Sequence, residues 1–481
     1  MDIPLISSIY VEKLFGLYCY RLPEAGALTN ASILYGDNGV GKSTILRLVF
    51  HLLSSATDRG HRNALYNAPF GRIEVLLDSG VLLSAAREVS EEGEFYEGLN
   101  KGLVLTIHKD SQLLGEFVFD PEKRNRAEYV SRGDIGQSVS LESINVEWVH
   151  NVKRNSFYKK GGVRLGDSDN YVHSKQAYMD ALATHAPTMF ILNADRRLDC
   201  DAVSDPSDEV ELRRVMRFEE PKRINDLVVR SREIALSQAL NSAAKWVSAK
   251  TLQSVNLGAE NVHTVYVNVL KHLVSTSNPN SEEAVPKTED LLKLISEIET
   301  KTAELSVYGL AAPLSLSEFR KSLSARARPK RVLAAGLLKP YLDSLKGRIE
   351  AVIPIYTVLH RFIGIVNDFL TDKDIEYKVG SGFRIISTHG GTPLDAGNLS
   401  SGEQQLLLLF CYVLTGRDKA CVFMIDEPEI SLNIKWQRKL VRTLLEVTEG
   451  ANIQFVFASH SIELLAQHKD RVVKVVNKNG Q

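Results

Sequence analysis

Short apolar runs separated by turn residues open the chain and predict strands. Such runs occupy residues 6–11, 17–20 and 32–34, and the third leads directly into Gly36-Asp37-Asn38-Gly39-Val40-Gly41-Lys42-Ser43. After this loop, apolar side chains recur at the spacing of one buried helix face, at Ile45, Leu46, Leu48, Val49, Leu52 and Leu53. The pattern therefore predicts a strand, a glycine-rich loop and a helix in that order.

Four further strand-like runs follow, at residues 72–77, 81–86, 103–107 and 116–119. The sequence Asp78-Ser79-Gly80 predicts a hairpin between the first two of them, so we expect an antiparallel sheet beside the first strand. Residues 120–180 are polar and carry no clear pattern, and we predict no element there. Residues 189–192 predict another buried strand.

The sequence between residues 208 and 372 is mostly helical in character, with breaks at prolines such as Pro313 and Pro329. Beyond it, residues 377–386 predict a hairpin around Gly380-Ser381-Gly382. Residues 421–425 and 453–458 are apolar except for Gln454, as is typical of strands that are covered on both faces. The predicted fold class is α/β, a mixed sheet with flanking helices and an antiparallel β-subdomain, with a mainly helical insertion.

Composition places the chain among globular proteins. Its 481 residues are 44% hydrophobic and 24% charged, which fits roughly two to four structural units. With 58 basic and 59 acidic residues the net charge is −1, so any contact with nucleic acid must be local. The four cysteines are far apart and predict neither a zinc ribbon nor a disulfide framework. Because the start lacks a signal-peptide pattern and the longest apolar run, 406–414, is about half a membrane span, we expect a cytoplasmic protein without membrane contact.

Residues 36–43 match the phosphate-binding pattern G-x-x-x-x-G-K-[ST] without a mismatch. The loop N–H groups and the helix N-terminus are expected to cradle phosphate oxygens. Lys42 is expected to pair with the β- and γ-phosphates, and Ser43 to ligate Mg²⁺. The strand–loop–helix context favours this interpretation over a glycine-rich turn that binds nothing.

Asp426 and Glu427 end a strand of apolar residues. Two acids at a strand end, taken alone, are more often solvated, but an upstream phosphate loop favours a catalytic pair. Asp426 is then expected to hold the hydration shell of Mg²⁺, and Glu427 to act as general base on the attacking water.

The sequence Leu399-Ser400-Ser401-Gly402-Glu403 precedes a leucine-rich helix. Ser400 is expected at or near the N-cap, with the helix dipole directed outward. An ordinary capping box of the S-x-x-E type is the alternative interpretation.

Five motifs now stand in the order found in ABC-class ATPases, and the chain resembles that class. They are the phosphate loop (Walker A), residues 399–403 (signature), Asp426-Glu427-Pro428-Glu429 (Walker B), Ser431-Leu432-Asn433 (D-loop) and Ala458-Ser459-His460 (switch histidine). Ser43 and Ser400 are 400 − 43 = 357 positions apart, a gap that resembles the SMC, RecF and OLD group of DNA-associated ATPases. We therefore expect residues 1–198 and 373–481 to form the two halves of the ATPase head, and residues 199–372 to form the insertion.

The resemblance implies roles for the matching positions. Ser400 and Gly402 would contact the γ-phosphate of ATP bound to another subunit, which implies a homo-oligomer, at least a dimer, while His460 would bind the γ-phosphate in cis. Asn433 would lie in the loop between two sites, and Gln137 or Asn193 could serve as the Q-loop residue. The implied ATP-binding residues are Gly36, Asp37, Asn38, Gly39, Val40, Gly41, Lys42, Ser43, Thr44, Ser400 and Gly402. The implied Mg²⁺ ligands are Ser43 and Asp426, and the implied catalytic residues are Lys42, Glu427 and His460.

Within that group the chain resembles the stand-alone ATPases of two-gene antiphage modules, namely the PARIS ATPase (AriA-like), with the Septu ATPase (PtuA-like) as a near neighbour. The insertion is too short for an SMC coiled-coil arm, and only 481 − 460 = 21 residues follow His460, so we expect no TOPRIM domain. The resemblance implies an ATP-dependent sensor and scaffold that restrains or releases a separate nuclease of TOPRIM or HNH type. The alternative is a DNA-repair ATPase of RecF or SMC type that binds duplex DNA directly.

One local cluster of positive charge stands out in the neutral chain. The basic island consists of Arg320, Lys321, Arg326, Arg328, Lys330, Arg331 and Lys339, in a stretch without acids. It predicts either a solvated helix face or a site for an anionic partner, such as DNA or an acidic phage trigger protein. A second group between Arg213 and Arg232 is mixed with acids and predicts a solvated face.

Overall fold

The computed structural model describes residues 5–57, 59–87, 102–121, 166–193, 198–200, 221–259, 267, 270, 287–324, 326–432 and 434–478. The chain divides into two compact units. The first unit comprises Met1–Asp205, Lys419–Arg438 and Ala451–Gln481, and the second comprises Pro206–Asp418 and Lys439–Gly450. This grouping differs from the three consecutive segments expected from the sequence, because residues 373–418 cluster with the helices of the second unit.

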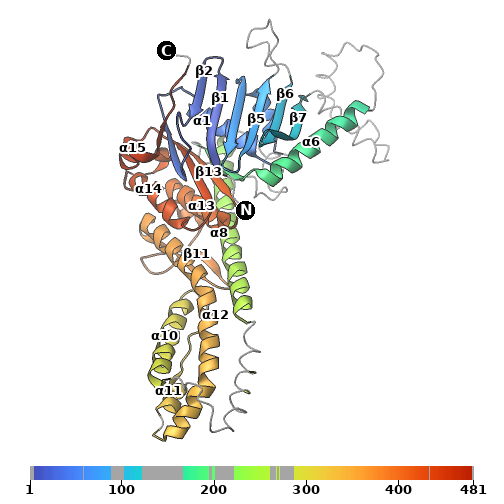
Figure 1. Cartoon of the computed structure of the whole chain (residues 1–481). Helices are drawn as coiled ribbons and strands as arrows, with labels where there is room; N and C mark the ends of the chain where they lie inside the picture. Colours follow the sequence, from blue (N-terminus) through green and yellow to red (C-terminus); the bar gives the residue numbers. More distant parts are fainter. Residues whose placement is uncertain are drawn as a thin grey trace, which may run out of the picture. The chain divides into compact units, whose positions relative to one another are not determined.

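An antiparallel sheet of six strands forms one layer of the first unit, in the order β2-β1-β4-β5-β6-β7 (Figure 1). Its strands are β1 (Ile6–Leu14), β2 (Tyr18–Leu22), β4 (Arg72–Leu77), β5 (Val81–Arg87), β6 (Leu103–Lys109) and β7 (Gln112–Phe119). Leu76 pairs with Leu82 across the turn at Gly80, whose φ of 78° only glycine adopts readily. The predicted hairpin and the four predicted strands are confirmed.

A second, mainly parallel sheet carries the loops of the site, in the order β15-β3-β14-β13-β8-β9. Its strands are β3 (Ala31–Tyr35), β8 (Thr188–Leu192), β9 (Leu198–Cys200), β13 (Cys421–Asp426), β14 (Ile453–Ala458) and β15 (Val472–Lys474). All pairs are parallel except β8 with β9. Parallel strands end at one common edge, so residues that follow β3, β8, β13 and β14 are brought together there. The predicted α/β fold class is confirmed.

Five helices belong wholly or partly to the first unit in its described part. They are α1 (Lys42–Leu53), α2 (His61–Asn67), α6 (Gly166–His185), α14 (Ile434–Val447) and α15 (Ile462–Gln467). Short 3₁₀ turns lie at Pro428–Ser431 (η4) and Lys469–Arg471 (η5). Helix α6 packs on β7 and falls in the region for which the sequence predicted no element.

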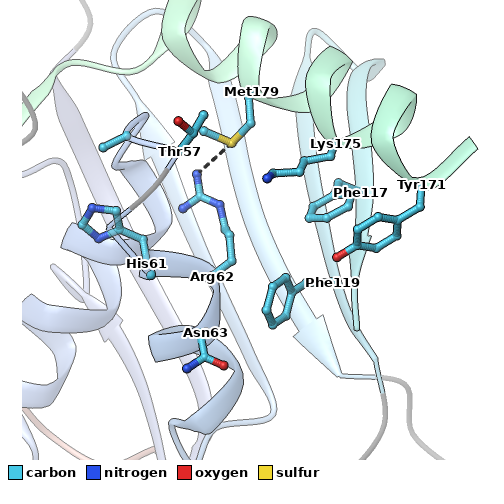
Figure 2. A pocket seen from close by; sticks show the side chains of 11 residues that line it. Thr57, His61, Arg62, Asn63, Phe117, Phe119, Tyr171, Lys175 and Met179 are labelled. Carbon is cyan, nitrogen blue, oxygen red and sulfur yellow. Dashed lines mark hydrogen bonds between the residues drawn. The ribbon is translucent and has the colours of Figure 1, made fainter. Parts of the chain in front are cut away.

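A small cavity lies beside α2, β7 and α6, with Phe117, Phe119 and Lys175 in its lining (Figure 2). It holds about 30 Å³, which is room for one or two water molecules. Arg62 also lines the cavity, and its buried guanidinium donates hydrogen bonds to the carbonyl oxygens of His51 (2.6 Å) and Ser54 (2.7 Å) at the end of α1. Arg62 therefore caps the C-terminus of α1, which is a structural role.

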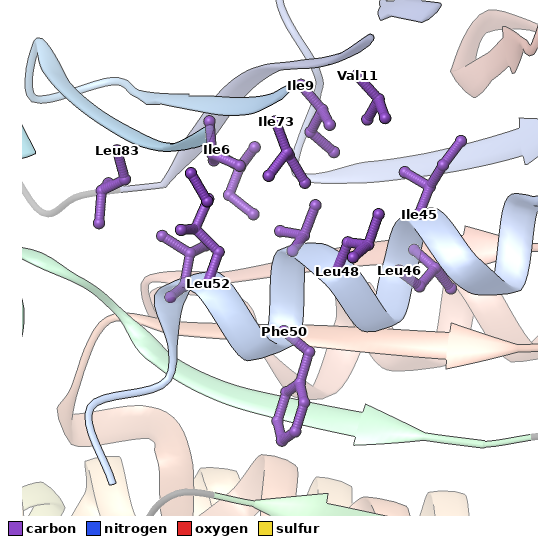
Figure 3. Packing of buried hydrophobic residues seen from close by; sticks show 14 of the residues in the cluster. Ile6, Ile9, Val11, Ile45, Leu46, Leu48, Phe50, Leu52, Ile73 and Leu83 are labelled. Atoms are coloured by element: carbon purple, nitrogen blue, oxygen red, sulfur yellow. The ribbon is translucent and has the colours of Figure 1, made fainter. Parts of the chain in front are cut away.

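Helix α1 packs between the two sheets, in contact with β5 on one side and with β8, β13 and β14 on the other. Figure 3 shows Ile45, Leu48 and Leu52 directed toward the antiparallel layer, and Phe50 on the opposite side of the helix. The helical spacing seen in the sequence is confirmed, because all six predicted positions are buried. The phosphate loop therefore leads into a helix whose apolar side chains are closely packed between the two sheets.

Gln454 is the one polar residue in β14, and it joins the two sheets. Its Oε1 accepts a hydrogen bond from the N–H of Ile6 in β1 (2.9 Å). Its Nε2 donates to the carbonyl oxygens of Ile6 (2.8 Å) and Thr29 (3.0 Å). A buried amide with three satisfied hydrogen bonds explains why an otherwise apolar strand tolerates glutamine.

The second unit is built on long helices, as the sequence predicted. Its elements are α8 (Pro221–Ala259), α10 (Thr288–Ser306), α11 (Ser317–Leu323), α12 (Arg328–Phe369), β10 (Lys373–Lys378), β11 (Gly382–Ser387), β12 (Pro393–Leu394), η2 (Ala396–Asn398), α13 (Ser401–Thr415) and η3 (Gly416–Asp418). Helix α12 packs along α8 and α10, and α13 packs on α8 (Figure 1). Tyr377 pairs with Phe383 in the predicted hairpin. Pro329 lies in the first turn of α12, where proline is tolerated.

Helix α12 is long and apolar enough over Lys330–Phe369 to cross a membrane, by length and composition. The core helices of proteins without membrane segments meet the same criterion. Here apolar residues such as Leu342, Leu359 and Phe362 are buried in the second unit. The packing on α8 and α10 accounts for the buried part of this helix, which is 39% of its most apolar window, while Val332, Leu333 and Tyr341 are exposed.

Candidate nucleotide-binding site

The phosphate loop connects β3 to α1, as predicted. Gly39 and Gly41 have φ angles of 86° and 89°, in the left-handed region that favours glycine. A Cβ on Gly41 would lie only 2.8 Å from Leu14 Cδ2, so a side chain at this N-cap position would collide with β1. Asp37 and Asn38 are exposed on the outer side of the loop. The loop has the backbone shape in which successive N–H groups can bind an anion.

Tyr20 in β2 contacts the phosphate loop, a role that the sequence did not predict. Its hydroxyl donates a hydrogen bond to the carbonyl oxygen of Val40 (2.9 Å). Burial raises the pKa of Tyr20 to about 12, with smaller effects from Tyr18 and Cys19. The tyrosine therefore stays protonated as a donor, and it holds the loop next to Gly41.

Lys42, the first residue of α1, is almost fully buried. Its Nζ donates to the carbonyl oxygens of Gly36 (2.9 Å) and Asp37 (3.1 Å) and to His460 Nε2 (2.5 Å). These three acceptors use all three N–H donors of an ammonium group. Burial lowers the pKa of Lys42, against the opposing effect of nearby acids, of which Glu427 is the largest.

Ser43 and Asp426 meet across 383 positions of sequence. The Ser43 hydroxyl donates to Asp426 Oδ1 at 2.8 Å, and Asp426 ends β13 with only 2% of its surface exposed. Burial raises the pKa of Asp426, partly opposed by the hydrogen bond from Ser43. A hydroxyl and a carboxylate side by side form the oxygen-donor set that Mg²⁺ prefers, so these residues fit the predicted metal role.

Glu427 directly follows β13 in a left-handed conformation, with φ of 48°. This backbone costs a non-glycine residue about 1 kcal/mol or more and is concentrated at functional sites. Its N–H donates to the carbonyl oxygen of Ala458 (2.8 Å). The ends of β13 and β14 are thereby joined, and Glu427 is fixed beside Asp426.

Glu429 contacts the loop that carries His460. Its Oε1 accepts from the backbone N–H of His460 (2.6 Å), and both carboxylate oxygens accept from the Ser459 hydroxyl (3.0 and 2.9 Å). The sequence contained Glu429 within a recognised motif, but its partners, about thirty positions downstream, could not be read from the pattern.

The Q-loop candidates have different outcomes. Leu192 pairs with Ile425, so Asn193 follows β8 at the same sheet edge as Asp426. Gln137 and the D-loop residue Asn433 lie outside the described residues. The structure therefore brings Walker A, Walker B, His460 and Asn193 to one edge of one sheet.

The signature residues belong to the second unit. Ser400 is exposed and is the N-cap of α13, where its hydroxyl accepts from the N–H of Glu403 (3.3 Å). Glu403 Oε2 accepts from the N–H of Ser400 (2.7 Å), which completes the capping box that the sequence allowed. Lys373 pairs with Glu403 at 3.1 Å. Burial would raise the pKa of Glu403, but hydrogen bonds from Ser400 and Lys373 outweigh it and hold this pKa below its ordinary value.

Two cations of the basic island are paired with acidic side chains, so the unpaired positive charge is smaller than the sequence indicates. Arg320 pairs with Glu299 (2.5 Å) and Lys321 with Glu318 (2.6 Å). Arg326, Lys330 and Lys339 are exposed. The side chain of Arg328 and most of the second basic group lie outside the described residues.

Comparison with known proteins agrees with this site. Residues 302–466 match the family model described as "AAA domain, putative AbiEii toxin, Type IV TA system". This range contains the signature, Walker B and switch-histidine positions.

Two curated relatives are named as ATP-binding proteins. The chain is 26% identical over 109 residues to a "Putative ABC transporter ATP-binding protein" of Clostridium acetobutylicum, which covers 23% of this chain and 38% of the relative. It is 35% identical over 85 residues to the "Molybdenum import ATP-binding protein ModC" of Escherichia coli, which covers 18% of this chain and 23% of the relative. The chain thus spans well under half of the length of either relative.

Two solved structures of Smc head domains also match. One, from Pyrococcus furiosus and bound to the C-terminal domain of ScpA, has 12% identity and a TM-score of 0.36 over 98% of this chain and 96% of its own. The other, from Pyrococcus yayanosii, has 13% identity and a TM-score of 0.34 over 99% and 97%. From its motif geometry and sheet order, the chain has an α/β P-loop ATPase fold, and its residues 302–466 match an AAA-family ATPase domain.

Proposed function

We propose that the protein binds ATP with Mg²⁺ and hydrolyses it at the edge of the parallel sheet. The observation that carries this proposal is the Ser43–Asp426 hydrogen bond of 2.8 Å, with Lys42 and His460 in contact beside it. Four side chains that ATP chemistry needs are thus brought together in two pairs, and the members of each pair are more than 380 positions apart in the sequence. Such convergence at a strand edge is the usual place for a ligand site in an α/β sheet.

Each group has a defined task in this proposal. Loop N–H groups bind phosphate oxygens, and Lys42 transfers its donors from backbone carbonyls to the β- and γ-phosphates. Ser43 and Asp426 would hold Mg²⁺, which would neutralise developing charge on the phosphates. Glu427 accepts a proton from the water that attacks the γ-phosphorus, while the bond to the β-phosphate oxygen breaks.

The test is steady-state ATP hydrolysis by the purified chain and two variants. Lys42→Ala should lose both nucleotide binding and turnover. Glu427→Gln keeps the side-chain shape but removes the base, so it should bind ATP and hydrolyse it at least about 100-fold more slowly. Hydrolysis by the Gln variant at the parental rate would show that Glu427 is not the general base.

The same proposal extends to assembly. Ser400 and Gly402 of one copy would contact the γ-phosphate held by a second copy, so ATP would close a homo-oligomer that is at least a dimer. The exposed Ser400 at the N-terminus of a 15-residue helix supports this, because a helix N-terminus favours an anion. Analytical ultracentrifugation of Glu427→Gln with and without ATP tests it, and an unchanged mass would contradict it.

For the cellular role, we propose a cytoplasmic sensor and scaffold subunit of an antiphage defence complex, with a separate nuclease as effector. ATP-driven opening and closing would then change the surface offered to that partner. The test incubates the chain with Mg²⁺ or Mn²⁺, ATP and DNA or RNA, with and without the product of the neighbouring gene. Cleavage by the chain alone, unaffected by Lys42→Ala, would contradict the scaffold role.

A DNA-repair ATPase that binds duplex DNA directly is the second candidate. The exposed cations Arg326, Lys330 and Lys339 favour an anionic partner of some kind. Salt-dependent DNA binding that ATP stimulates would support this candidate. Charge reversal at Arg326, Arg328 and Arg331 should then abolish the response to DNA or to an acidic trigger, with basal ATP turnover unchanged.

A further inference from the structure

Glu429 lies two residues beyond Glu427, in the 3₁₀ turn η4, and its carboxylate is partly buried. The loop it touches, residues 459–461, runs from the end of β14 to the start of α15. This loop carries His460, whose Nε2 contacts Lys42. Glu429 therefore connects the segment after the Walker B acids to the histidine at the phosphate loop.

The contact is strong by its chemistry. A carboxylate that accepts from a backbone N–H at 2.6 Å and from a hydroxyl at 2.9 to 3.0 Å makes charge-assisted hydrogen bonds. Ser459 is fully buried, so its hydroxyl needs a partner within the protein. The backbone of His460 is thereby fixed from one side by Glu429.

A glutamine in α14, Gln437, completes the connection. Gln437 Nε2 donates to the carbonyl oxygens of Glu429 (3.2 Å) and Leu432 (2.8 Å). Its Oε1 lies 2.9 Å from the Ser461 hydroxyl, and the Ser461 N–H donates to the Ser459 hydroxyl (3.0 Å). The two segments are thus joined at both ends, and displacement of η4 must displace the histidine loop.

We propose that Glu429 is a positioning residue that fixes the backbone of His460 and so sets where its imidazole meets Lys42 and the γ-phosphate. The proposal rests on the ATP site proposed above. Glu429 acts through His460 and touches no reacting atom itself. Its charge also lies near Lys42, so the test must separate an electrostatic effect from a positional one.

Kinetics of a small variant set make that separation. Glu429→Ala should lower kcat about 10- to 100-fold and leave KM for ATP within about 3-fold, because a misplaced group costs the transition state more than binding. Glu429→Gln keeps an acceptor for the His460 N–H without the charge, and should fall between Ala and the parent. Glu463→Gln removes a nearby acid that makes no hydrogen bond to this loop in the described structure, and serves as the matched control with parental rates.

Non-additivity with His460 is the decisive kinetic result. If Glu429 acts only through His460, the double variant Glu429→Ala/His460→Ala should match His460→Ala within about 2-fold. Independent multiplication of the two losses would overturn the proposal, as would parental kcat in Glu429→Ala.

A measurement that needs no ATP turnover separates this proposal from the proposed function. Hydrogen exchange of the His460 amide, resolved by mass spectrometry with fragmentation, should accelerate at least about 10-fold in Glu429→Ala, with β14 amides unchanged. Unchanged exchange would overturn the positioning role even in an active ATPase. Accelerated exchange in a chain that hydrolyses no ATP would instead refute only the proposed function.

Discussion

The Walker loops of the first unit and the signature loop of the second are held in opposite ways. Lys42 meets His460 across 418 positions, and Ser43 meets Asp426 across 383. Ser400 meets Glu403 across three, within one turn of its own helix. The Walker site can exist only after the parallel sheet has formed, whereas the signature loop is shaped mainly by its own helix, with Lys373 as an ion-pair partner from β10.

Replacement of Asp426 should have the largest effect, because it alters the Walker site, which depends on contacts between residues far apart in the sequence. Asp426→Asn keeps the bond from Ser43 but loses the negative charge that suits Mg²⁺, so kcat should fall at least about 100-fold. Stability should not fall, since burial disfavours the charged form of Asp426. Mg²⁺-dependent hydrolysis and thermal unfolding check both parts, and parental turnover would contradict the metal assignment.

The next effect concerns the ion pair between Lys373 and Glu403, which joins β10 to the signature loop. Lys373→Ala leaves the carboxylate of Glu403, which is 5% exposed, without its ion pair, and should lower the free energy of unfolding by about 2–3 kcal/mol. Arg442→Ala is the matched control, because Arg442 and Glu446 pair on the surface with 79% and 45% exposure and should contribute under about 0.5 kcal/mol. Equal losses in chemical denaturation would contradict the buried-pair argument.

The stability of the first unit should depend on pH because of two histidines near the C-terminal end of α1. His51 and His61 lie 2.9 Å apart through their Nδ1 atoms. Burial is the main cause that lowers the pKa of His51 to about 4 and that of His61 to about 3. Arg62 adds to the effect on His51, and His51 followed by Arg62 adds to the effect on His61. The unfolded chain titrates near 6.5, so it binds more protons below that pH. Stability should therefore be complete above about pH 6.5 and fall by roughly 1–2 kcal/mol per histidine toward about pH 5.

Thermal unfolding of the parent and His61→Gln at about pH 7.5 and about pH 5 checks this sign. The variant should show a smaller loss on acidification. His389→Gln is the control, because the His389 side chain is 82% exposed in the second unit. Identical pH slopes in all three proteins would exclude the histidine pair as the cause.

The smallest effect on stability should come from the signature loop, where Ser400 contacts a residue of its own helix. Ser400→Ala removes the N-cap of α13 and should cost about 1 kcal/mol. Ser400→Asp keeps the cap, so it should be nearly neutral for stability, but it places a negative charge where a partner's ATP is proposed to bind. Loss of ATP-dependent assembly in the Asp variant, with a parental Tm, would separate capping from phosphate recognition.

The range of each interaction decided what the sequence could predict. The strands, α1, the hairpin at Gly80 and the Ser400 capping box follow from spacing within one element, and they are confirmed. The contacts of Tyr20 with Val40 and Glu429 with His460 join elements that only the folded sheet brings together. Strand β9 and helix α6 were missed because few apolar residues mark them, and β15 was missed although Val472 and Val473 are apolar, because it is only three residues long.

Gln454 has a mechanical consequence for the first unit. A slide of β1 past β14 by one residue would strip its amide and the main-chain groups of Ile6 and Thr29 of their bonds at once, at a cost of several kcal/mol. Sliding of one sheet past the other is therefore opposed by all three hydrogen bonds of Gln454. The two sheets of this unit should therefore move as one body, with the side chain of Gln454 fixing the position of β1 relative to β14.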